Sequence, residues 1–227
     1  MENEHKVMDD IVEVGRRIYM NGFVAANDGN ISVRVGDDEI ITTPTGVSKG
    51  FLTPDMLVKV NMDGQRISGN LKPSSEIKMH IEVYKQRSDV RAVVHAHPIT
   101  ATGFAVAGIP LEKCVLPEVV LSLGSIPIAK YGTPSTMELP EAINEFLPTC
   151  DAVLLANHGA LTVGVDVFSA YYKMETLEHF AKISLVAREL GGERLLTYED
   201  VDKLMEVRRK LNITGKNRGC MECSKSD

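Results

Sequence analysis

Apolar residues recur every three or four positions in several stretches of the chain, a spacing typical of helices that bury one face. The longest stretch runs from Val167 to about Leu190, where two consecutive glycines provide a stop signal. The same spacing and similar boundary residues predict further helices near residues 11–20, 73–84, 99–107, 138–147 and 198–211. A single helical turn is expected at Thr53-Pro54-Asp55.

Alternating or continuous apolar runs predict strands between these helices. Two pairs of runs surround turn-forming triplets and indicate hairpins, at residues 31–42 and 57–68. Short buried strands are expected at 92–95, 151–155 and 160–163, and the Gly- and Pro-rich stretch 108–131 should hold only short strands and turns. Because tight turns join several neighbouring strands, the pattern favours one α/β domain with a central mixed, mostly antiparallel β-sheet covered by helices.

Composition narrows the class of protein. The 227 residues include 44% hydrophobic side chains, which is enough for a full core, and the net charge is −6. Without a basic field, neither nucleic acid nor an anionic membrane is an expected partner. The acidic N-terminus leads into no apolar segment, and the long uncharged stretches are interrupted, so no signal peptide or membrane span is predicted. We therefore expect a cytoplasmic protein with a folded domain over residues 1–214.

Four cysteines are too few and too scattered to predict a disulfide framework. Cys114 and Cys150 are isolated, whereas Cys220 and Cys223 form a Cys-x-x-Cys pair that could bind a metal or cycle between redox states. No second pair accompanies it, and chain ends are usually poorly ordered. We expect residues 215–227 to be a flexible, reduced, polar tail.

Candidate chemistry centres on His95-Ala96-His97 at the end of a predicted strand. Alternate strand residues point to one side, so both imidazoles can face the same point. His158 lies in a turn after another apolar strand, and Glu76 lies in the first turn of a predicted helix. Three imidazoles and a carboxylate are typical ligands of Zn²⁺ at a catalytic site, although a partly exposed histidine pair and a simple helix cap fit the same residues. His80, further along the helix of Glu76, reads as a surface residue or as a support for this group.

A second set of motifs suits an anion. Asn27–Asn30 and Thr45-Gly46 are turn-like segments, and Ser74-Ser75 opens a helix. Glycine allows close approach of the backbone, hydroxyls donate hydrogen bonds, and a helix N-terminus offers free N–H groups. Each motif alone is more often a turn or a cap, so its meaning depends on whether the fold brings the three together.

Five motifs together resemble a known family. Gly29–Ser32, Thr43–Gly46, Ser74–Glu76, His95–His97 and Asn157–Gly159 occur in the order and approximate spacing of the class II (zinc-dependent) sugar-phosphate aldolase and ribulose-5-phosphate 4-epimerase superfamily, and the chain looks most similar to its fuculose-1-phosphate aldolase-like members. The resemblance extends over about residues 7–210. It implies a nine-stranded, mostly antiparallel sheet and a C4 homotetramer with active sites at subunit interfaces.

The resemblance also assigns roles to individual residues. It implies a site for Zn²⁺, or for another divalent cation such as Mn²⁺ or Co²⁺, formed by Glu76, His95, His97 and His158. It implies a site for the phosphate of a phosphorylated sugar formed by Gly29, Asn30, Thr45, Gly46, Ser74 and Ser75. Glu76 would serve both as a ligand and as the acid/base that exchanges a proton with the substrate carbon.

The expected activity is that of a metal-dependent lyase of carbohydrate metabolism. It would reversibly cleave a ketose 1-phosphate, similar to fuculose 1-phosphate, into dihydroxyacetone phosphate and a short aldehyde. The divalent cation would stabilise the electrons left next to the ketone. Ser-Ser-Glu resembles the aldolase form of the motif, since the epimerases have Ser-Ser-Asp. The alternatives are a pentulose-phosphate 4-epimerase, a methylthioribulose-1-phosphate dehydratase and a non-catalytic, adducin-like binding module.

The sequence departs from the family pattern on the aldehyde side. The fuculose enzyme has a Tyr about nineteen residues beyond the His-x-His pair, contributed across the subunit interface as a proton donor, and another near its C-terminus. Here Leu116-Pro117-Glu118 occupies the first place, and no Tyr follows Tyr198. Glu118 is the one group there that can transfer a proton, and apolar neighbours would favour its protonated form. An exposed Glu after a proline is the competing interpretation.

Overall fold

Most neighbouring strands of the central sheet are consecutive in sequence, as the turn pattern predicts. The computed structural model describes residues 4–224, and within them eight strands form one sheet in the order β4-β3-β2-β1-β5-β8-β7-β6. Every neighbouring pair is antiparallel except β6 and β7, so the sheet is mixed but mostly antiparallel. The strands are β1 (Asn30–Arg34), β2 (Glu39–Thr42), β3 (Val58–Asn61), β4 (Arg66–Ser68), β5 (Ala92–Ala96), β6 (Ile128–Ala129), β7 (Ala152–Leu155) and β8 (Gly159–Gly164).

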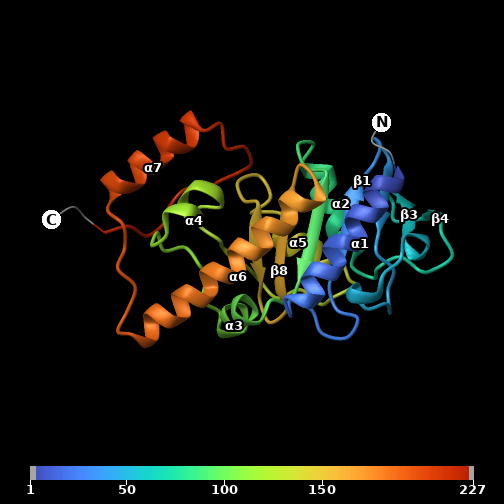
Figure 1. Cartoon of the computed structure of the whole chain (residues 1–227), viewed down its shortest axis with the longest axis horizontal. Helices are drawn as coiled ribbons and strands as arrows, with labels where there is room; N and C mark the ends of the chain where they lie inside the picture. The colour runs from blue at the N-terminus through green and yellow to red at the C-terminus, as the bar shows by residue number, and fades with distance from the viewer. Residues whose placement is uncertain (1–3, 225–227) are drawn as a thin grey trace.

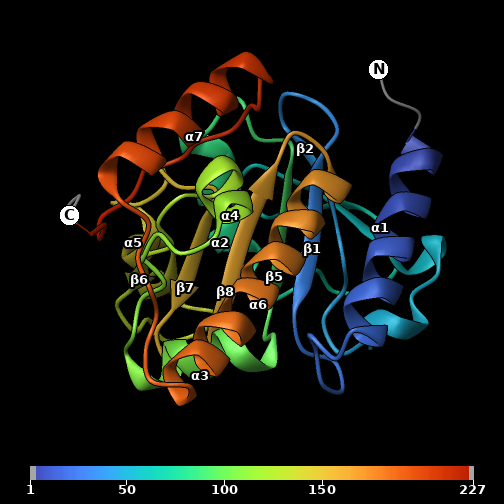
Figure 2. The ribbon, with the colours of Figure 1, turned by 60° about the vertical axis from the view of Figure 1, so that its left-hand side comes forward.

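Helices cover both faces of this sheet (Figures 1 and 2). On one face, α1 (Glu4–Met20), α3 (Ile99–Ala107) and α6 (Val167–Glu189) share a core with inward side chains of the strands. On the other face, α2 (Ile77–Gln86) and α5 (Glu138–Ile143) form a second core. The short α4 (Pro117–Ser122) and α7 (Tyr198–Lys210) pack together at one end of the molecule, and the turns η1 (Lys49–Phe51) and η2 (Pro54–Met56) contact α1.

The longest helix shows why the hydrophobic pattern was informative. Asp166 caps α6 by accepting a hydrogen bond from the Ser169 N–H at 2.7 Å. Met174 and Leu177, one turn apart, are fully buried against the sheet. Burial of each such side chain stabilises the fold by about 2 kcal/mol. The sequence-predicted helix from Val167 to about Leu190 is confirmed.

Strand register places two chemically important residues side by side. In the β1–β5 ladder Asn30 pairs with His95, and in the β5–β8 ladder His95 pairs with Leu161. The end of β5, the start of β1 and the start of β8 therefore lie side by side, at the same end of these three central strands. The predicted hairpin of residues 31–42 is confirmed by the antiparallel register of β1 and β2.

Two expectations about the fold need correction. The stretch 108–131 contains the helix α4 in addition to turns, because Pro117 occupies a first helical position where its missing N–H costs nothing. The resemblance implied nine strands, whereas the sheet formed by residues 4–224 has eight.

The structure also differs from the predicted flexible, reduced tail. Cys220 forms a disulfide with Cys114, and the segment before it is fastened to α4, since the Asn217 Nδ2 donates to the Val120 carbonyl at 2.8 Å. The Met221 N–H donates to the Ser125 hydroxyl at 3.0 Å. Residues 215–224 are therefore an integral part of the fold, while 225–227 of the predicted tail lie outside the described residues. Local composition could not reveal this contact, because its partners are about 100 residues upstream.

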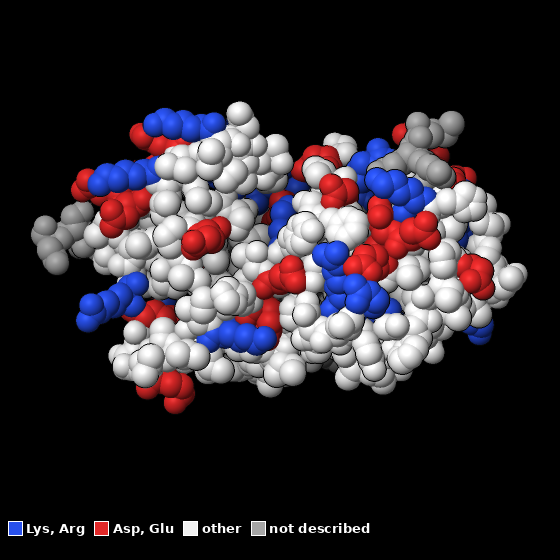
Figure 3. Space-filling view, in the orientation of Figure 1, with Lys and Arg blue, Asp and Glu red and all other residues white. Residues whose placement is uncertain are grey.

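The surface agrees with the absence of a basic field in the composition. Figure 3 shows Lys and Arg interspersed with Asp and Glu on one face of the molecule. Among residues 4–224, no helix combines the length and the apolar character needed to cross a membrane.

Candidate functional site

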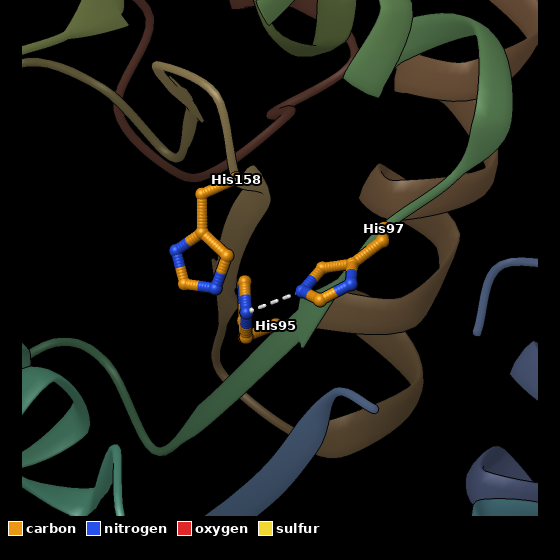
Figure 4. Close-up of side chains that lie close together, drawn as sticks. All are labelled: His95, His97 and His158. Carbon is orange, nitrogen blue, oxygen red and sulfur yellow. Dashed lines mark hydrogen bonds between the residues drawn. The ribbon is translucent and has the colours of Figure 1, made fainter. Parts of the chain in front are cut away.

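Three imidazoles converge at the end of the central strand β5 (Figure 4). His95 belongs to β5, His97 directly follows it, and His158 lies in the turn between β7 and β8. The ring centroids are 4.9 Å apart for His95 and His97, 4.6 Å for His95 and His158, and 5.1 Å for His97 and His158. One nitrogen of each ring lies within 4.8 Å of the other two, close enough to share a metal ion.

Glu76 completes this group from the opposite side. Its Oε2 is 3.4 Å from the His95 Nε2, and its Oε1 is 3.3 Å from the His158 Nε2. The Asn30 Nδ2 donates a 2.7 Å hydrogen bond to Oε2, and the Ser74 hydroxyl accepts from the Glu76 N–H at 3.3 Å. The carboxylate is thus held in place by β1 and by the turn that precedes α2.

Hydrogen bonds define how the rings are oriented. The His95 Nδ1 lies 2.9 Å from the Ala160 carbonyl, which can only accept, so Nδ1 carries the proton and Nε2 faces the centre with a lone pair. The His97 Nδ1 faces the Asp28 carboxylate at 3.6 Å, which leaves its Nε2 directed at the His95 Nε2 only 3.1 Å away. Two lone pairs this close repel each other unless a cation or a proton lies between them.

Burial keeps the imidazoles in the form that binds a metal. The pKa of His95 is lowered well below its ordinary value by burial, and then by the neighbouring His158 and His97. Burial also lowers the pKa of His158, against the opposing charge of Glu76. Neutral rings are metal ligands, whereas imidazolium rings are not.

The donor set fits a borderline divalent cation. Three ring nitrogens and one carboxylate match the ligands of catalytic zinc sites. The Glu76 Oε1 is buried and lacks a hydrogen-bond partner, although an unsatisfied buried carboxylate oxygen is costly. A bound cation would satisfy this oxygen and remove the repulsion between the His95 and His97 nitrogens.

The three motifs that the sequence offers for an anion also lie together. An isolated bridge joins Pro44 to Pro73, and the Ser74 N–H donates to the Thr43 carbonyl at 3.1 Å, so the loops containing Thr45-Gly46 and Ser74-Ser75 are neighbours. Thr45, Gly46 and Ser75 are exposed and accessible to a ligand. The Asn30 amide, from the first of the three motifs, donates to the Glu76 carboxylate, which follows Ser74-Ser75 directly in sequence.

Gly29 is required at the point where the start of β1 approaches the histidine cluster. Its φ is +73°, and a Cβ there would lie 2.7 Å from the Val24 side chain and 2.8 Å from the His95 carbonyl oxygen. Only glycine allows β1 to start this close to the end of β5. The motif that resembles a phosphate loop therefore also has a packing role.

Sequence reasoning missed Lys49. It is 1% exposed. Its Nζ donates to the carbonyls of Asn27 at 2.9 Å and Val47 at 2.8 Å, which ties the loop before β1 to the loop that contains Thr45-Gly46. Burial lowers its pKa to about 8, while the charges of Asp28 and Glu76 act in the opposite direction. Lysine followed by glycine in a loop resembles an exposed residue, so the sequence held no signal of this role.

His80 is buried, and its interpretation as a surface residue is wrong. Its Nδ1 lies 2.7 Å from the Ser32 hydroxyl, which is also 2.7 Å from the Tyr84 hydroxyl. Complete burial lowers the pKa of His80 to about 3, with a smaller effect from His95. This neutral network packs beneath the site, on the side of the sheet covered by α2.

Glu118 is not part of this cluster within a single chain. It is exposed in the first turn of α4 and lines a separate cleft of about 760 Å³ with Asn21, Glu175 and His179. The expected apolar surroundings are wrong, because the neighbouring valines point into the cores and leave Glu118 outside.

Comparison with known proteins identifies the family. A profile described as the class II aldolase and adducin N-terminal domain matches residues 9–185. This chain belongs to the class II aldolase family. The family is typically dependent on a divalent metal ion, which agrees with the donor set around His95.

Curated relatives carry two different activities. The chain is 34% identical to the L-fuculose phosphate aldolase of Methanococcus maripaludis over 81% of its length and 98% of the relative. It is 29% identical to the 3-oxo-tetronate 4-phosphate decarboxylase of Pectobacterium atrosepticum, over 91% of its length and 94% of the relative. This chain is therefore an enzyme of the metal-dependent aldolase type.

Solved structures share its fold. An L-fuculose 1-phosphate aldolase gives a TM-score of 0.83 at 27% identity, covering 90% of this chain and 96% of that protein. The YgbL protein of Klebsiella pneumoniae, described as an aldolase, epimerase or decarboxylase, gives 0.82 at 30% identity, covering 90% and 100%. The class II aldolase fold expected from the five motifs is confirmed.

Proposed function

We propose that this class II aldolase family enzyme reversibly cleaves a ketose 1-phosphate, similar to fuculose 1-phosphate, into dihydroxyacetone phosphate and a short aldehyde. The observation that carries the proposal is the convergence of His95, His97, His158 and Glu76 beside the loops of Thr45-Gly46 and Ser74-Ser75. The 34% identity to an L-fuculose phosphate aldolase supports the substrate class.

We assign the metal site to the three histidines and Glu76, with Zn²⁺ as the expected ion and Mn²⁺ or Co²⁺ as substitutes. When bound there, the ion supplies a Lewis acid that stabilises negative charge next to the substrate ketone. The histidines position the ion, and the proton on the His95 Nδ1 is held by the Ala160 carbonyl, which keeps Nε2 free for it.

Glu76 is the proposed proton carrier. Its two oxygens face different imidazoles, and one of them already accepts from the Asn30 amide. A carboxylate so placed can hold a proton taken from, or given to, the carbon next to the ketone while the Asn30 amide keeps it oriented. The epimerase alternative is less favoured, because Glu76 matches the aldolase form of the motif.

The phosphate is the proposed anchor of the substrate. The backbone around Gly29, Gly46 and Ser75, together with the hydroxyls of Thr45 and Ser74, would bind it, while Lys49 holds the loops together from below. Fixing the phosphate converts binding energy into orientation of the ketone toward the metal site.

Decarboxylation is a second candidate, favoured by the decarboxylase relative that spans 91% of this chain. Loss of CO₂ from a 3-oxo-tetronate 4-phosphate, followed by protonation of the carbon, also produces dihydroxyacetone phosphate. Both reactions break a C–C bond next to a ketone and leave the same electron pair to be stabilised. They differ only in the fragment that leaves, an aldehyde or CO₂.

The test therefore has to measure both products. Purified enzyme loaded with Zn²⁺, Mn²⁺ or Co²⁺ is incubated with fuculose 1-phosphate and with 3-oxo-tetronate 4-phosphate. Dihydroxyacetone phosphate is detected by a coupled reductase, and the second product by aldehyde derivatisation or CO₂ capture. Aldehyde from the ketose phosphate supports the proposal, whereas CO₂ from the tetronate alone replaces it with the decarboxylase. Product NMR separates both from epimerisation or loss of water, which keep the carbon chain intact.

We further propose that the enzyme acts as a cytoplasmic homotetramer whose active sites are shared between subunits. The position of Glu118 supports this, since it is exposed on α4 and lines a cleft that contains none of the three clustered histidines, where it could face the site of a neighbouring subunit. Sedimentation analysis of the holoenzyme tests it, and a monomer with full activity would contradict it.

A further inference from the structure

Three cysteine sulfurs come together at the end of the molecule that lies opposite β4. The sulfurs of Cys114, Cys220 and Cys223 all lie within 4.8 Å of one another. Cys114 and Cys220 are joined as a disulfide with Cα atoms 5.8 Å apart, while Cys223 keeps a free thiol. This cysteine cluster shares no residue with the histidine site.

The backbone holds the cluster together independently of the disulfide. The Cys114 N–H donates to the Glu222 carbonyl at 3.1 Å, and the Leu196 N–H donates to the Cys114 carbonyl at 2.8 Å. The Ser224 N–H in turn donates to the Leu196 carbonyl at 3.0 Å. Three segments that are distant in sequence thus lie side by side, so the sulfurs would stay close if the disulfide were reduced.

The surroundings of the cluster are apolar on one side and polar on the other. Val120 and Val201 are buried against Cys114, with Leu204 and Met205 partly buried beside them. The bridge from Thr197 to Ser224 brings the N-terminus of the thirteen-residue helix α7 next to the Cys-x-x-Cys turn.

A third sulfur beside a disulfide makes a thiolate metal site possible when the disulfide is reduced. A disulfide needs two sulfurs, and a third nearby thiol would exchange with it. Zinc bound to thiolates has Zn–S distances of about 2.3 Å, and ligand pairs spaced Cys-x-x-Cys are typical of structural zinc sites. Tetrahedral geometry places such sulfurs about 3.8 Å apart, which is inside the 4.8 Å that encloses the three, and Cys114 and Cys220 would separate to this spacing when their bond is reduced.

We propose that, once the disulfide is reduced, Cys114, Cys220 and Cys223 bind a second Zn²⁺ that has a structural role. A dithiol or a phosphine reduces the disulfide to two thiols and is itself oxidised, and zinc binding then releases the three thiol protons. The three sulfurs would supply three of the four ligands of a tetrahedral ion, which leaves the fourth position to a water molecule. The site would fasten residues 215–224 to the segment that carries α4.

Cobalt spectroscopy tests this proposal directly. The reduced chain, in a phosphine reductant without oxygen, is loaded with Co²⁺, because thiolate–Co²⁺ charge transfer gives a near-ultraviolet band that imidazole and carboxylate ligands do not give. We expect the band in the wild-type chain and in His95→Ala, which disrupts only the histidine site. Absence of the band from both would overturn the proposal, and this arm needs no cysteine variant to fold.

Cysteine variants then locate the ligands. Cys223→Ser should lose the band and one equivalent of zinc per chain, whereas Cys150→Ser should keep both, because Cys150 is buried in the α2–α5 core away from the cluster. Circular dichroism confirms that each variant is folded. A band that survives in folded Cys223→Ser would contradict the assignment. Because the readout is metal content and not turnover, the result is independent of which reaction the histidine site performs.

Discussion

The histidine site and the region around Glu118 differ in how the chain constructs them. His95 is completely buried and fixed by its register with Asn30 and Leu161 in the middle of the sheet. Glu118 is exposed on a six-residue helix, supported by Arg208, which donates to the Leu121 carbonyl, and by Asn217. The half of the site that would bind metal is complete in one chain, whereas the half proposed to face the aldehyde is not.

This difference indicates how each half should respond to mutation. Changes in the metal half should alter metal content and turnover together, since its residues share a single ion in our proposal. Changes at Glu118 should alter turnover with the metal retained. The following predictions separate the two halves.

The largest effect is expected for His95→Ala. Loss of a central ligand should abolish metal uptake and reduce kcat/KM by about 10³-fold or more, because a Lewis acid supplies several kcal/mol of stabilisation. Metal content by mass spectrometry and the coupled assay measure both changes. His5→Ala, at an exposed position of α1, is the matched control. Normal metal content in His95→Ala would contradict the assigned site.

Glu76→Gln should separate metal binding from proton transfer. The amide keeps an oxygen that can accept from Asn30 but cannot carry a proton, so some metal should remain while kcat falls by about 10²- to 10⁴-fold. Glu82→Gln, on the exposed side of α2, serves as the control. Unchanged turnover at Glu76→Gln would remove this residue from the mechanism.

Glu118→Ala should affect kcat with unchanged metal content. We expect a decrease of about 10²-fold, the lower end of general acid–base effects, measured on the assembled holoenzyme. Glu199→Ala removes an acidic residue from the first turn of α7 and controls for the loss of charge at a helix N-terminus. An effect confined to the melting temperature would return Glu118 to a purely structural role.

The smallest expected effect concerns Lys49, whose burial should make the free energy of unfolding depend on pH. Its pKa is about 8 in the folded chain and 10.5 in the unfolded chain, so between these values only the unfolded chain holds the proton. The free energy of unfolding should therefore rise with pH across this window, by at most about 1.4 kcal/mol per pH unit. Below pH 8 the full cost of burying the charge remains.

Denaturant titrations from pH 7.5 to 10.5 can measure this contribution. Lys49→Met should show a shallower rise than the wild-type chain, whereas Lys78→Met, at an exposed position of α2, should follow the wild type. Parallel curves for Lys49→Met and the wild type would contradict the lowered pKa.

Local patterns were sufficient for most of the fold and for the convergence of the histidines. Period-2 and period-3.6 spacing predicted β1–β2 and α6, and alternation along β5 placed His95 and His97 toward one point. Contacts between distant segments were less accessible. The pairing of Cys114 with Cys220 depends on the path of the chain after α7, and local sequence carries no information about that path.

Buried polar residues were the other source of error. His80 was interpreted mainly as a surface residue and Lys49 was overlooked, because a charged or titratable side chain is rarely buried without a partner. Their partners are backbone carbonyls and the Ser32 hydroxyl, which no sequence spacing reveals. Glu118 shows the converse, since apolar neighbours in sequence point into the cores and leave it outside.

The attachment of residues 215–224 to α4 affects how the protein should be handled in the laboratory. A shortened chain ending near Gly215 would keep every histidine and Glu76 but would lose the Asn217 contact that supports the helix of Glu118. Affinity tags are therefore better added before α1. Directed evolution of substrate specificity should include Asn217 in its libraries, because changes there can move α4 without touching the three histidines or Glu76.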